Sequence, residues 1–454
     1  MRSIRQRSII VCLLTLVFVV GLATYVVRLV LNAEKWALDK HNPRLGSAGV
    51  TDLGVIKDCN DVVLAQTIND KRVYSTESKV RMAMLHVVGD DASFIDTSIQ
   101  SNYQTGIWGY NIVTGLNPPE FISNKRDIKL TLDSKVCCKA VESMGKYKGA
   151  VIVYNYKTGK VVCMSSLPTY DPMSPPDLDR DYTGEYEGAY LNRALSASYT
   201  PGSIFKIITS IAALKHYPSV ESEIFNCQHT YNIGDSKITC VGTHGNIGFN
   251  SAFVNSCNVA FAKIAINVGS AGMMDTTKEL GFGESFEVSG VSTKKSKYNV
   301  SGISEVDLGW SGVGQYDTLV NPMHMLIILG AIANDGVPVM PYFVDSIISQ
   351  ENIEQVSAKE GSRLCSATNA AKIKDMMRNA VKYSYGDNAF GGMKEVCAKT
   401  GTAEVGENKK PNAWIAGFSK NESTPYAFVV VMENAGGGAQ YAIPVAANVL
   451  SLLK

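Results

Sequence analysis

A run of nineteen residues without a formal charge, residues 9–27, restricts the fold of this 454-residue chain more than any other feature. The run, IIVCLLTLVFVVGLATYVV, is about long enough to cross the ~30 Å hydrocarbon core of a membrane as a helix. Three arginines precede it, which favours a cytoplasmic N-terminus. A cleavable signal peptide is the alternative, because Gly21 and Ala23 form a small-x-small pattern, but the length of the run favours an uncleaved anchor. We expect a cytoplasmic segment at 1–8 and a single-pass protein of the cell membrane with its remainder outside.

The rest of the composition is that of an ordinary globular protein. Hydrophobic residues make up 45% of the chain and charged residues 19%, and 43 basic side chains balance 42 acidic ones. A net charge of +1 provides no general surface for polyanions, so we expect no nucleic acid partner.

Sequence patterns divide the extracytoplasmic part in two. Residues 28–125 contain short mixed segments and predict a small, partly extended pedestal. Residues 126–454 have strand-like runs near both ends, including a hairpin over 149–166, with helix-like blocks between them. This arrangement predicts one sheet flanked by helices in an α+β domain. The helix-like blocks are residues 203–217, 255–269, 321–335, 367–384 and 442–454.

Cysteines are numerous, and two of them are the best candidates for a bond. The chain has ten, and Cys227 and Cys240 lie in one short segment, CQHTYNIGDSKITCVGTH. A disulfide between them is our first expectation outside the cytoplasm, ahead of free thiols. Because His229 and His244 lie in the same segment, zinc is a third alternative, although the usual C-x2-C spacing is missing.

An apolar helix-like run, PGSIFKIITS, contains Lys206 three residues after Ser203. The lysine could extend its amine to water, or Ser203 and Lys206 could form a nucleophile and base on one helix face. Alone the pattern is weak, because three further Ser-x-x-Lys matches begin at Ser143, Ser292 and Ser451.

Two further short motifs each occur twice. Ser256-Cys257-Asn258 precedes an apolar helix-like stretch, where Ser256 could be an N-cap, a catalytic relay or both, and Ser419-Lys420-Asn421 has the same form. Lys-Thr-Gly occurs at 157–159, where a hairpin turn is the simplest interpretation, and at 399–401 in an extended stretch. There, Gly401 would let a ligand approach the backbone.

Taken in order, Ser203, Ser256 and Lys399 make the Ser-x-x-Lys, Ser-x-Asn and Lys-Thr-Gly set of penicillin-binding proteins and serine β-lactamases. The chain resembles the transpeptidase domain of a class B penicillin-binding protein over residues 126–454, in blocks such as LNRALSASYTPGSIFKIITSIAAL, GVGQYDTLVNPMHMLIILGAIANDGV and NAWIAGFS. The resemblance implies a central antiparallel sheet flanked by helices, with an anchor at 9–27 and a pedestal at 28–125.

The resemblance also implies roles for individual residues. Ser203 would attack the carbonyl between the last two D-alanines of a peptidoglycan stem peptide. Lys206 would act as base, Ser256 would pass the proton to the leaving amine, and Asn258 would orient Lys206 and the substrate. The extended stretch with the Lys-Thr-Gly motif would bind the terminal carboxylate and the peptide, through Lys399, Thr400, Gly401 and Thr402. The backbone N–H groups of Ser203 and Thr402 would form the oxyanion hole.

Partners and rival functions follow from the same resemblance. It implies lipid-linked stem peptides as substrate, β-lactams as inhibitors, a polytopic membrane glycosyltransferase as partner, and no cofactor or metal for the reaction. A D,D-carboxypeptidase remains open, as does a β-lactamase, for which Glu223 or Glu279 could be the deacylating glutamate. A non-catalytic penicillin-binding scaffold or sensor is the non-enzymatic alternative.

Overall fold

The structure is a computed structural model that describes residues 2–37, 54–69, 71–103, 107, 125–349 and 351–454. Parts of the predicted pedestal, residues 38–53 and 108–124, lie outside the described residues.

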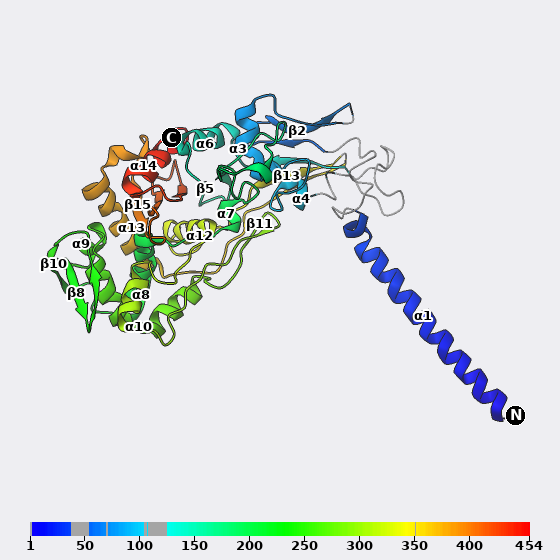
Figure 1. Cartoon of the computed structure of the whole chain (residues 1–454), viewed down its shortest axis with the longest axis horizontal. Coiled ribbons are helices and arrows are strands. Elements are labelled where there is room, and N and C mark those ends of the chain that lie inside the picture. The colour runs from blue at the N-terminus through cyan, green and yellow to red at the C-terminus, as the bar shows by residue number, and fades with distance from the viewer. Residues whose placement is uncertain (1, 38–53, 70, 104–106, 108–124, 350) are drawn as a thin grey trace.

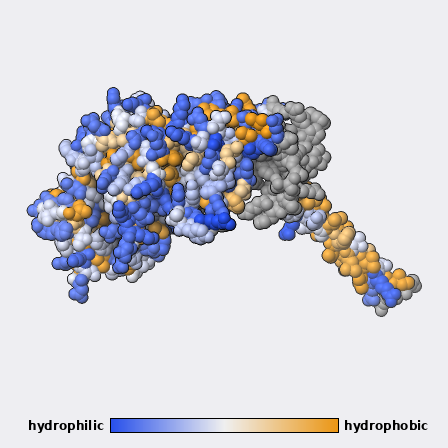
Figure 2. Space-filling model, turned by 45° about the horizontal axis from the view of Figure 1, so that its top comes forward, coloured by the Kyte–Doolittle hydropathy of each residue, from blue (hydrophilic) through white to orange (hydrophobic). Residues whose placement is uncertain are grey.

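The predicted anchor is a single long helix. α1 (Arg2–Ala37) extends beyond 9–27 in both directions, and its segment Ile4–Ala33 is apolar and long enough to cross a membrane. None of the most apolar window of that segment is buried against the rest of the molecule. Figure 2 shows hydrophobic residues along most of the helix, and Figure 1 shows it projecting from the body. The helix therefore has the composition and exposure of a membrane anchor.

A five-stranded antiparallel sheet forms the centre of the body, as expected. Its order is β15-β16-β17-β5-β6, with each neighbouring pair antiparallel. Strands from the two ends of the predicted domain meet at the pairing of β17 with β5, and all of β16 is buried. The strands are β5 (Gly149–Asn155), β6 (Val161–Leu167), β15 (Val396–Ala403), β16 (Asn412–Ser419) and β17 (Tyr426–Met432).

Helices cover the two sides of this sheet (Figure 1). α6 (Ser134–Met144) and α14 (Gly438–Leu450) pack against each other and on the sheet. α12 (Pro322–Ala333) packs on β5, β16 and β17, beside α7 (Arg193–Ser196) and α13 (Ala367–Ala380). Every residue of α12 is buried, which agrees with its uncharged sequence.

A mostly helical region stands beside the β15 edge of the sheet. It begins with a 3-10 turn, η3 (Gly202–Phe205), that leads into α8 (Lys206–His216). α8 packs on α10, and α10 packs on α11. The remaining elements are α9 (Phe249–Val254), α10 (Asn258–Glu279), α11 (Glu305–Gly312), β7 (Ile224–Cys227) paired with β10 (Gly245–Gly248), β8 (Thr230–Ile233) paired with β9 (Ser236–Thr239), and β11 (Glu287–Val288) paired with β12 (Val291–Ser292).

The second large sheet joins segments that are far apart in the sequence. Its order is β14-β13-β4-β1-β2-β3, so strands on both sides of residue 125 complete it. The pedestal therefore shares its sheet with the following domain, and the boundary at 125/126 stays a prediction. The elements of this region are β1 (Ile56–Lys57), β2 (Val63–Ile68), β3 (Lys71–Tyr74), α3 (Ser78–Val88), α4 (Ile99–Asn102), β4 (Asp127–Leu130), β13 (Val344–Ile348) and β14 (Ile353–Gln355).

Candidate active site

The three motifs meet at one cavity of about 450 Å³ between the β15 edge and the helical region. Ser203 comes from η3, Ser256 comes from the connection between α9 and α10, and Asn258 is the first residue of α10. Strand β15 provides Thr400 and Thr402. All five of these predicted residues line the cavity.

Lys206 lies behind the cavity wall and has no exposed surface, so the alternative of an amine extended to water is wrong. Its Nζ lies 3.0 Å from Ser203 Oγ and 3.1 Å from Ser256 Oγ. Nζ also donates to the backbone oxygen of Ser256 at 2.6 Å and to Asn258 Oδ1 at 2.8 Å. Burial, reinforced by the charge of Lys399, holds the pKa of the Lys206 amine well below its usual value.

The hydrogen-bond partners of Lys206 suit a neutral amine. Asn258 Nδ2 donates to the backbone oxygen of Thr239 at 3.0 Å, which orients the amide so that Oδ1 faces the lysine. Oδ1 and the Ser256 carbonyl can only accept, so they take both hydrogens of an uncharged NH2 group. The lone pair is then left for a hydroxyl hydrogen, and the nearest hydroxyl is that of Ser203.

Ser256 adopts a backbone conformation that is uncommon for residues with a side chain. Its φ is 53°, in the left-handed region. The alternative that Ser256 caps the following helix is wrong, because the N-cap of α10 is Cys257, whose side chain accepts from the backbone N–H of Ala260. Instead the hydroxyl of Ser256 lies between two lysines, 3.1 Å from Lys206 Nζ and 2.9 Å from Lys399 Nζ.

Lys399 is also fully buried, and it is not among the residues that line the cavity. Its Nζ donates to Ser256 Oγ and, at 3.1 Å, to the backbone oxygen of Thr400. Burial lowers the pKa of Lys399 to about 7. In this structure, therefore, Lys399 contacts Ser256, while Thr400 and Thr402 line the cavity.

Gly401 does not line the cavity either. A Cβ on Gly401 would lie 2.6 Å from the backbone oxygen of Pro201, and a Cβ on Gly202 would lie 2.6 Å from that of Thr402. In addition, Gly202 has a φ of 56°. The two glycines thus allow η3 and β15 to touch backbone to backbone, which sets the position of Ser203 relative to Thr402.

Several residues at the site lie outside the three motifs. The most directly placed is Tyr385, at the end of a π-helical turn, η4 (Val381–Tyr385), that follows α13. Its hydroxyl accepts from the backbone N–H of Thr400 at 3.1 Å and lies 3.0 Å from Thr400 Oγ1. Tyr385 itself does not line the cavity; the lining residues for which the sequence predicted no role include Thr239, Val241, Trp310, Val313, Gln315 and Glu404. Only spatial neighbours reveal them, although Val313 and Gln315 lie in a block that resembles the family.

The cysteines do not pair as first expected. Cys227 and Cys240 are both free thiols, and they lie close to His244 and Cys257. His229 is not part of this group, and Cys257 is the middle residue of the Ser-x-Asn motif.

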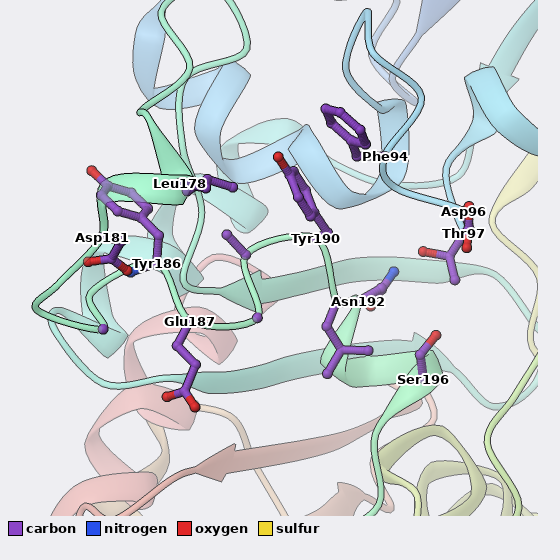
Figure 3. A pocket seen from close by; sticks show the side chains of 14 residues that line it. Phe94, Asp96, Thr97, Leu178, Asp181, Tyr186, Glu187, Tyr190, Asn192 and Ser196 are labelled. Atoms are coloured by element: carbon purple, nitrogen blue, oxygen red, sulfur yellow. The ribbon is translucent and has the colours of Figure 1, made fainter. Parts of the chain in front are cut away.

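A larger cavity, of about 670 Å³, lies elsewhere, between the pedestal and the loop that includes η2 (Leu178–Arg180). Figure 3 shows Phe94 and Tyr190 on one side of it and Glu187 on the other. Its lining includes none of the predicted site residues, so its size gives no reason to move the candidate active site.

The cavity where the three motifs meet has a buried lysine between two serines on an α+β scaffold. This arrangement defines a serine acyltransferase type of site. The sequence profile of the family described as "Penicillin binding protein transpeptidase domain" matches residues 149–451, and the chain belongs to this family.

Known proteins with related sequences are similar over the same region. The chain is 28% identical over 312 residues to peptidoglycan D,D-transpeptidase PbpA of Mycolicibacterium smegmatis, covering 64% of this chain and 63% of that protein. It is 27% identical over 346 residues to stage V sporulation protein D of Bacillus subtilis, covering 71% of this chain and 52% of that protein. The match thus spans between about half and just under two thirds of the length of these relatives.

Solved structures show the same fold. The imipenem acyl-enzyme complex of penicillin-binding protein A from M. tuberculosis superposes with a TM-score of 0.76 at 24% identity, covering 89% of this chain and 99% of that one. The D,D-transpeptidase domain from Eggerthella lenta gives a TM-score of 0.76 at 23% identity, covering 88% and 98%.

Proposed function

We propose that this chain is a membrane-anchored peptidoglycan D,D-transpeptidase that crosslinks stem peptides through an acyl-Ser203 intermediate and is inhibited by β-lactams. The observation that carries the proposal is the position of Lys206: it is buried, its pKa is lowered, and its Nζ lies 3.0 Å from Ser203 Oγ. Such an amine can take the hydroxyl proton at a pH lower than an exposed lysine would allow.

The proposed reaction has two halves. Lys206 takes the proton of Ser203, whose Oγ attacks the carbonyl carbon of the penultimate D-alanine. Ser256, which lies between Lys206 and Lys399, passes a proton to the amine of the leaving D-alanine, and an ester on Ser203 remains. The amine of a second stem peptide then attacks the ester, gives up its proton and restores the Ser203 hydroxyl.

Substrate binding is assigned to the β15 side of the cavity. Thr400 and Thr402 would hold the terminal carboxylate, and Lys399 adds positive charge behind Ser256. The backbone N–H groups of Ser203 and Thr402 would form the oxyanion hole, where one donor contributes about 3 to 4 kcal/mol in other acyl-transfer enzymes.

A β-lactamase would need a carboxylate near the acyl group. Of the two glutamates considered, Glu279 forms an exposed pair with Lys215 at the end of α10, and neither it nor Glu223 lines the cavity. The one carboxylate among the described lining residues is Glu404. This placement favours transfer to an amine over a lactamase built on Glu223 or Glu279.

One experiment separates the alternatives. The full-length chain in detergent is labelled with a fluorescent penicillin and chased, then given lipid-linked peptidoglycan polymerised by a separate glycosyltransferase. We expect a long-lived label and crosslinked product, both lost in Ser203→Ala and retained in Ser292→Ala, whose serine begins another Ser-x-x-Lys match.

Each rival predicts a different result. Loss of the label within seconds would indicate a β-lactamase. Release of D-alanine without crosslinks would indicate a carboxypeptidase. A stable label without any turnover would indicate a sensor or scaffold, and no label at all would overturn the assignment of Ser203.

Topology and partner complete the proposal. We infer that α1 crosses the cell membrane once, with residues 1–8 in the cytoplasm and the domain at 126–454 outside, in keeping with its apolar composition and the arginines before the span. As in the family that it resembles, the glycan strands would come from a polytopic membrane glycosyltransferase.

A further inference from the structure

Four side chains capable of binding a metal converge directly behind the Ser-x-Asn motif. They are Cys227, Cys240, His244 and Cys257, here called the Cys3His cluster, and their ligand atoms all lie within 4.8 Å of one another. Cys227 ends β7, Cys240 follows β9, His244 precedes β10 and Cys257 caps α10. Four separate chain segments thus direct one ligand atom each to the same point.

The distances within the cluster agree with a tetrahedral centre. His244 Nδ1 lies 3.5 Å from Cys227 Sγ and 3.5 Å from Cys240 Sγ, and Cys240 Sγ lies 3.9 Å from Cys257 Sγ. Zinc bonds of about 2.3 Å to sulfur and about 2.05 Å to nitrogen, at tetrahedral angles, place two sulfurs about 3.8 Å apart and a sulfur and a nitrogen about 3.6 Å apart. These three of the six pairs therefore already lie near tetrahedral separations, and the other pairs, which lie within 4.8 Å, need only a small movement of the side chains to bind an ion.

The chemistry of the donors also favours zinc. Three sulfurs and one imidazole nitrogen form a closed set typical of structural zinc sites, and all three cysteines are buried. A disulfide would use only two of the sulfurs and would bring them to about 2.05 Å, leaving the third thiol and the histidine without a role.

We propose that the Cys3His cluster binds one Zn²⁺ ion and that this ion is a structural element that fixes the Ser-x-Asn motif beside the active site. The thiol protons are released to solvent as the thiolates bind. The ion does not contact the reacting atoms, so the cluster residues are positioning residues.

The connection from the cluster to the site is short. Cys257 lies between Ser256 and Asn258 in the sequence, and the backbone N–H of Asn258 donates to Cys240 Sγ at 3.3 Å. Both neighbours contact Lys206 Nζ, and Ser256 is held in its left-handed conformation. An ion bound to Cys240 and Cys257 would therefore hold the Ser-x-Asn motif in place at the start of α10. It would act directly through Cys257, and through the hydrogen bond from Asn258 to Cys240.

The test is the metal content of the full-length chain, purified in detergent through a tag without histidines. We expect about one equivalent of zinc per chain by mass spectrometry. His244→Asn should lose most of it, whereas the matched change His229→Asn, at an exposed histidine of the same segment outside the cluster, should keep it. Exchange for cobalt(II) should give the absorption bands of tetrahedral thiolate coordination in the wild type and in His229→Asn.

Acylation by penicillin supplies a second, separable readout. Removal of zinc, by His244→Asn or by a chelator, should slow labelling of Ser203 at least tenfold. Ser203→Ala should abolish labelling but keep its zinc, so failure of the proposed function and failure of the zinc proposal give different results. A wild-type chain without stoichiometric zinc, or with Cys227 and Cys240 joined by a disulfide in a peptide map, overturns the proposal even if His244→Asn does not fold.

Discussion

Two buried lysines share one hydroxyl group, and this arrangement sets the chemistry of the site. Lys206 and Lys399 both lie within hydrogen-bond distance of Ser256 Oγ and have no exposed surface. Two ammonium groups so close and so poorly solvated repel each other, so the pair favours a state with fewer protons. The protein thereby keeps a free amine next to a serine at a pH where an exposed lysine would be charged.

Removal of the Lys206 amine tests this account directly. We expect Lys206→Ala to slow acylation of Ser203 by penicillin about 10²- to 10⁴-fold, the range typical of a lost general base. Lys146→Ala is the matched control, because Lys146 ends another Ser-x-x-Lys match and is exposed. Acylation rates by gel fluorescence, with circular dichroism to confirm folding, provide the measurement; an unchanged rate in Lys206→Ala would remove this residue from the mechanism.

The pH dependence of acylation follows from the lowered pKa of the Lys206 amine. Only the neutral amine of Lys206 accepts a proton, so the rate should rise with pH as Lys206 loses its proton. Because the pKa is held well below its usual value, the rate should level off well below pH ~10.5. Rate constants for penicillin acylation measured from acid to alkaline pH check this, and a rate that still rises near the pKa of an exposed lysine would contradict it.

At the scale of secondary-structure elements, a substitution at Gly401 tests the close backbone contact between η3 and β15. A Cβ on Gly401 would lie 2.6 Å from the backbone oxygen of Pro201, so Gly401→Ala must push β15 away from η3. We expect a loss of about 1 to 3 kcal/mol in stability and slower acylation, because Ser203 and Thr402 move apart. Gly437→Ala, with nothing within 4 Å of its added Cβ, should leave both thermal unfolding and acylation nearly unchanged.

The sequence predicted the main elements where hydrophobic patterns are long and unbroken. The buried helix α12, the hairpin of β5 and β6, and strands β15 to β17 all follow from such patterns. Short polar contacts could not be predicted in this way. Tyr385 reaches Thr400 only because a π-helical turn ends α13, and the cap of α10 is Cys257, a residue type not usually considered for that position.

The four residues Ser203, Lys206, Ser256 and Asn258 meet as the motif order implied, because each lies on or beside a helix that starts at the cavity. The side-chain directions along β15 were harder to predict. A strand alternates its faces, so Lys399 and Gly401 lie on the opposite face of β15 from Thr400 and Thr402 and do not line the cavity, although the Lys399 amine still reaches Ser256 Oγ.

At the scale of the whole molecule, two buried histidines among the described residues connect distant segments. His86 Nε2 lies 2.8 Å from the backbone oxygen of Ala189, and His324 contacts Ser296 Oγ and the backbone oxygen of Leu280, each at 2.7 Å. Burial lowers the pKa of each to about 4, so both are neutral at pH 7.

Global stability should therefore fall with acid. Above pH ~6.5 neither histidine is charged in the folded or the unfolded chain. Between pH ~6.5 and pH ~4, both histidines bind protons in the unfolded chain but stay neutral in the folded chain. The free energy of unfolding should decrease on the order of 3 kcal/mol per histidine over this window. Thermal unfolding from pH 7 to 4 measures this, and His324→Gln should flatten the dependence, whereas His229→Asn, at an exposed histidine, should not.

The second large sheet, β14-β13-β4-β1-β2-β3, could not be predicted from local patterns, because strands that pair in it are far apart in the chain. Ile128 on β4 pairs with Ile347 on β13, and Ile56 on β1 pairs with Ile128. The pedestal sequence shows only short segments, and nothing within residues 28–125 indicates that strands near residue 350 complete its sheet.

This pairing has a consequence for biogenesis. If export proceeds from the N-terminus, β1 to β4 reach the outer side of the membrane long before β13 and β14 are synthesised, so their open edge waits unprotected close to the lipid surface. The six-stranded sheet would then be completed only after most of the following domain has been exported. During that interval, the nascent chain would depend on factors at the translocation site that cover exposed strand edges.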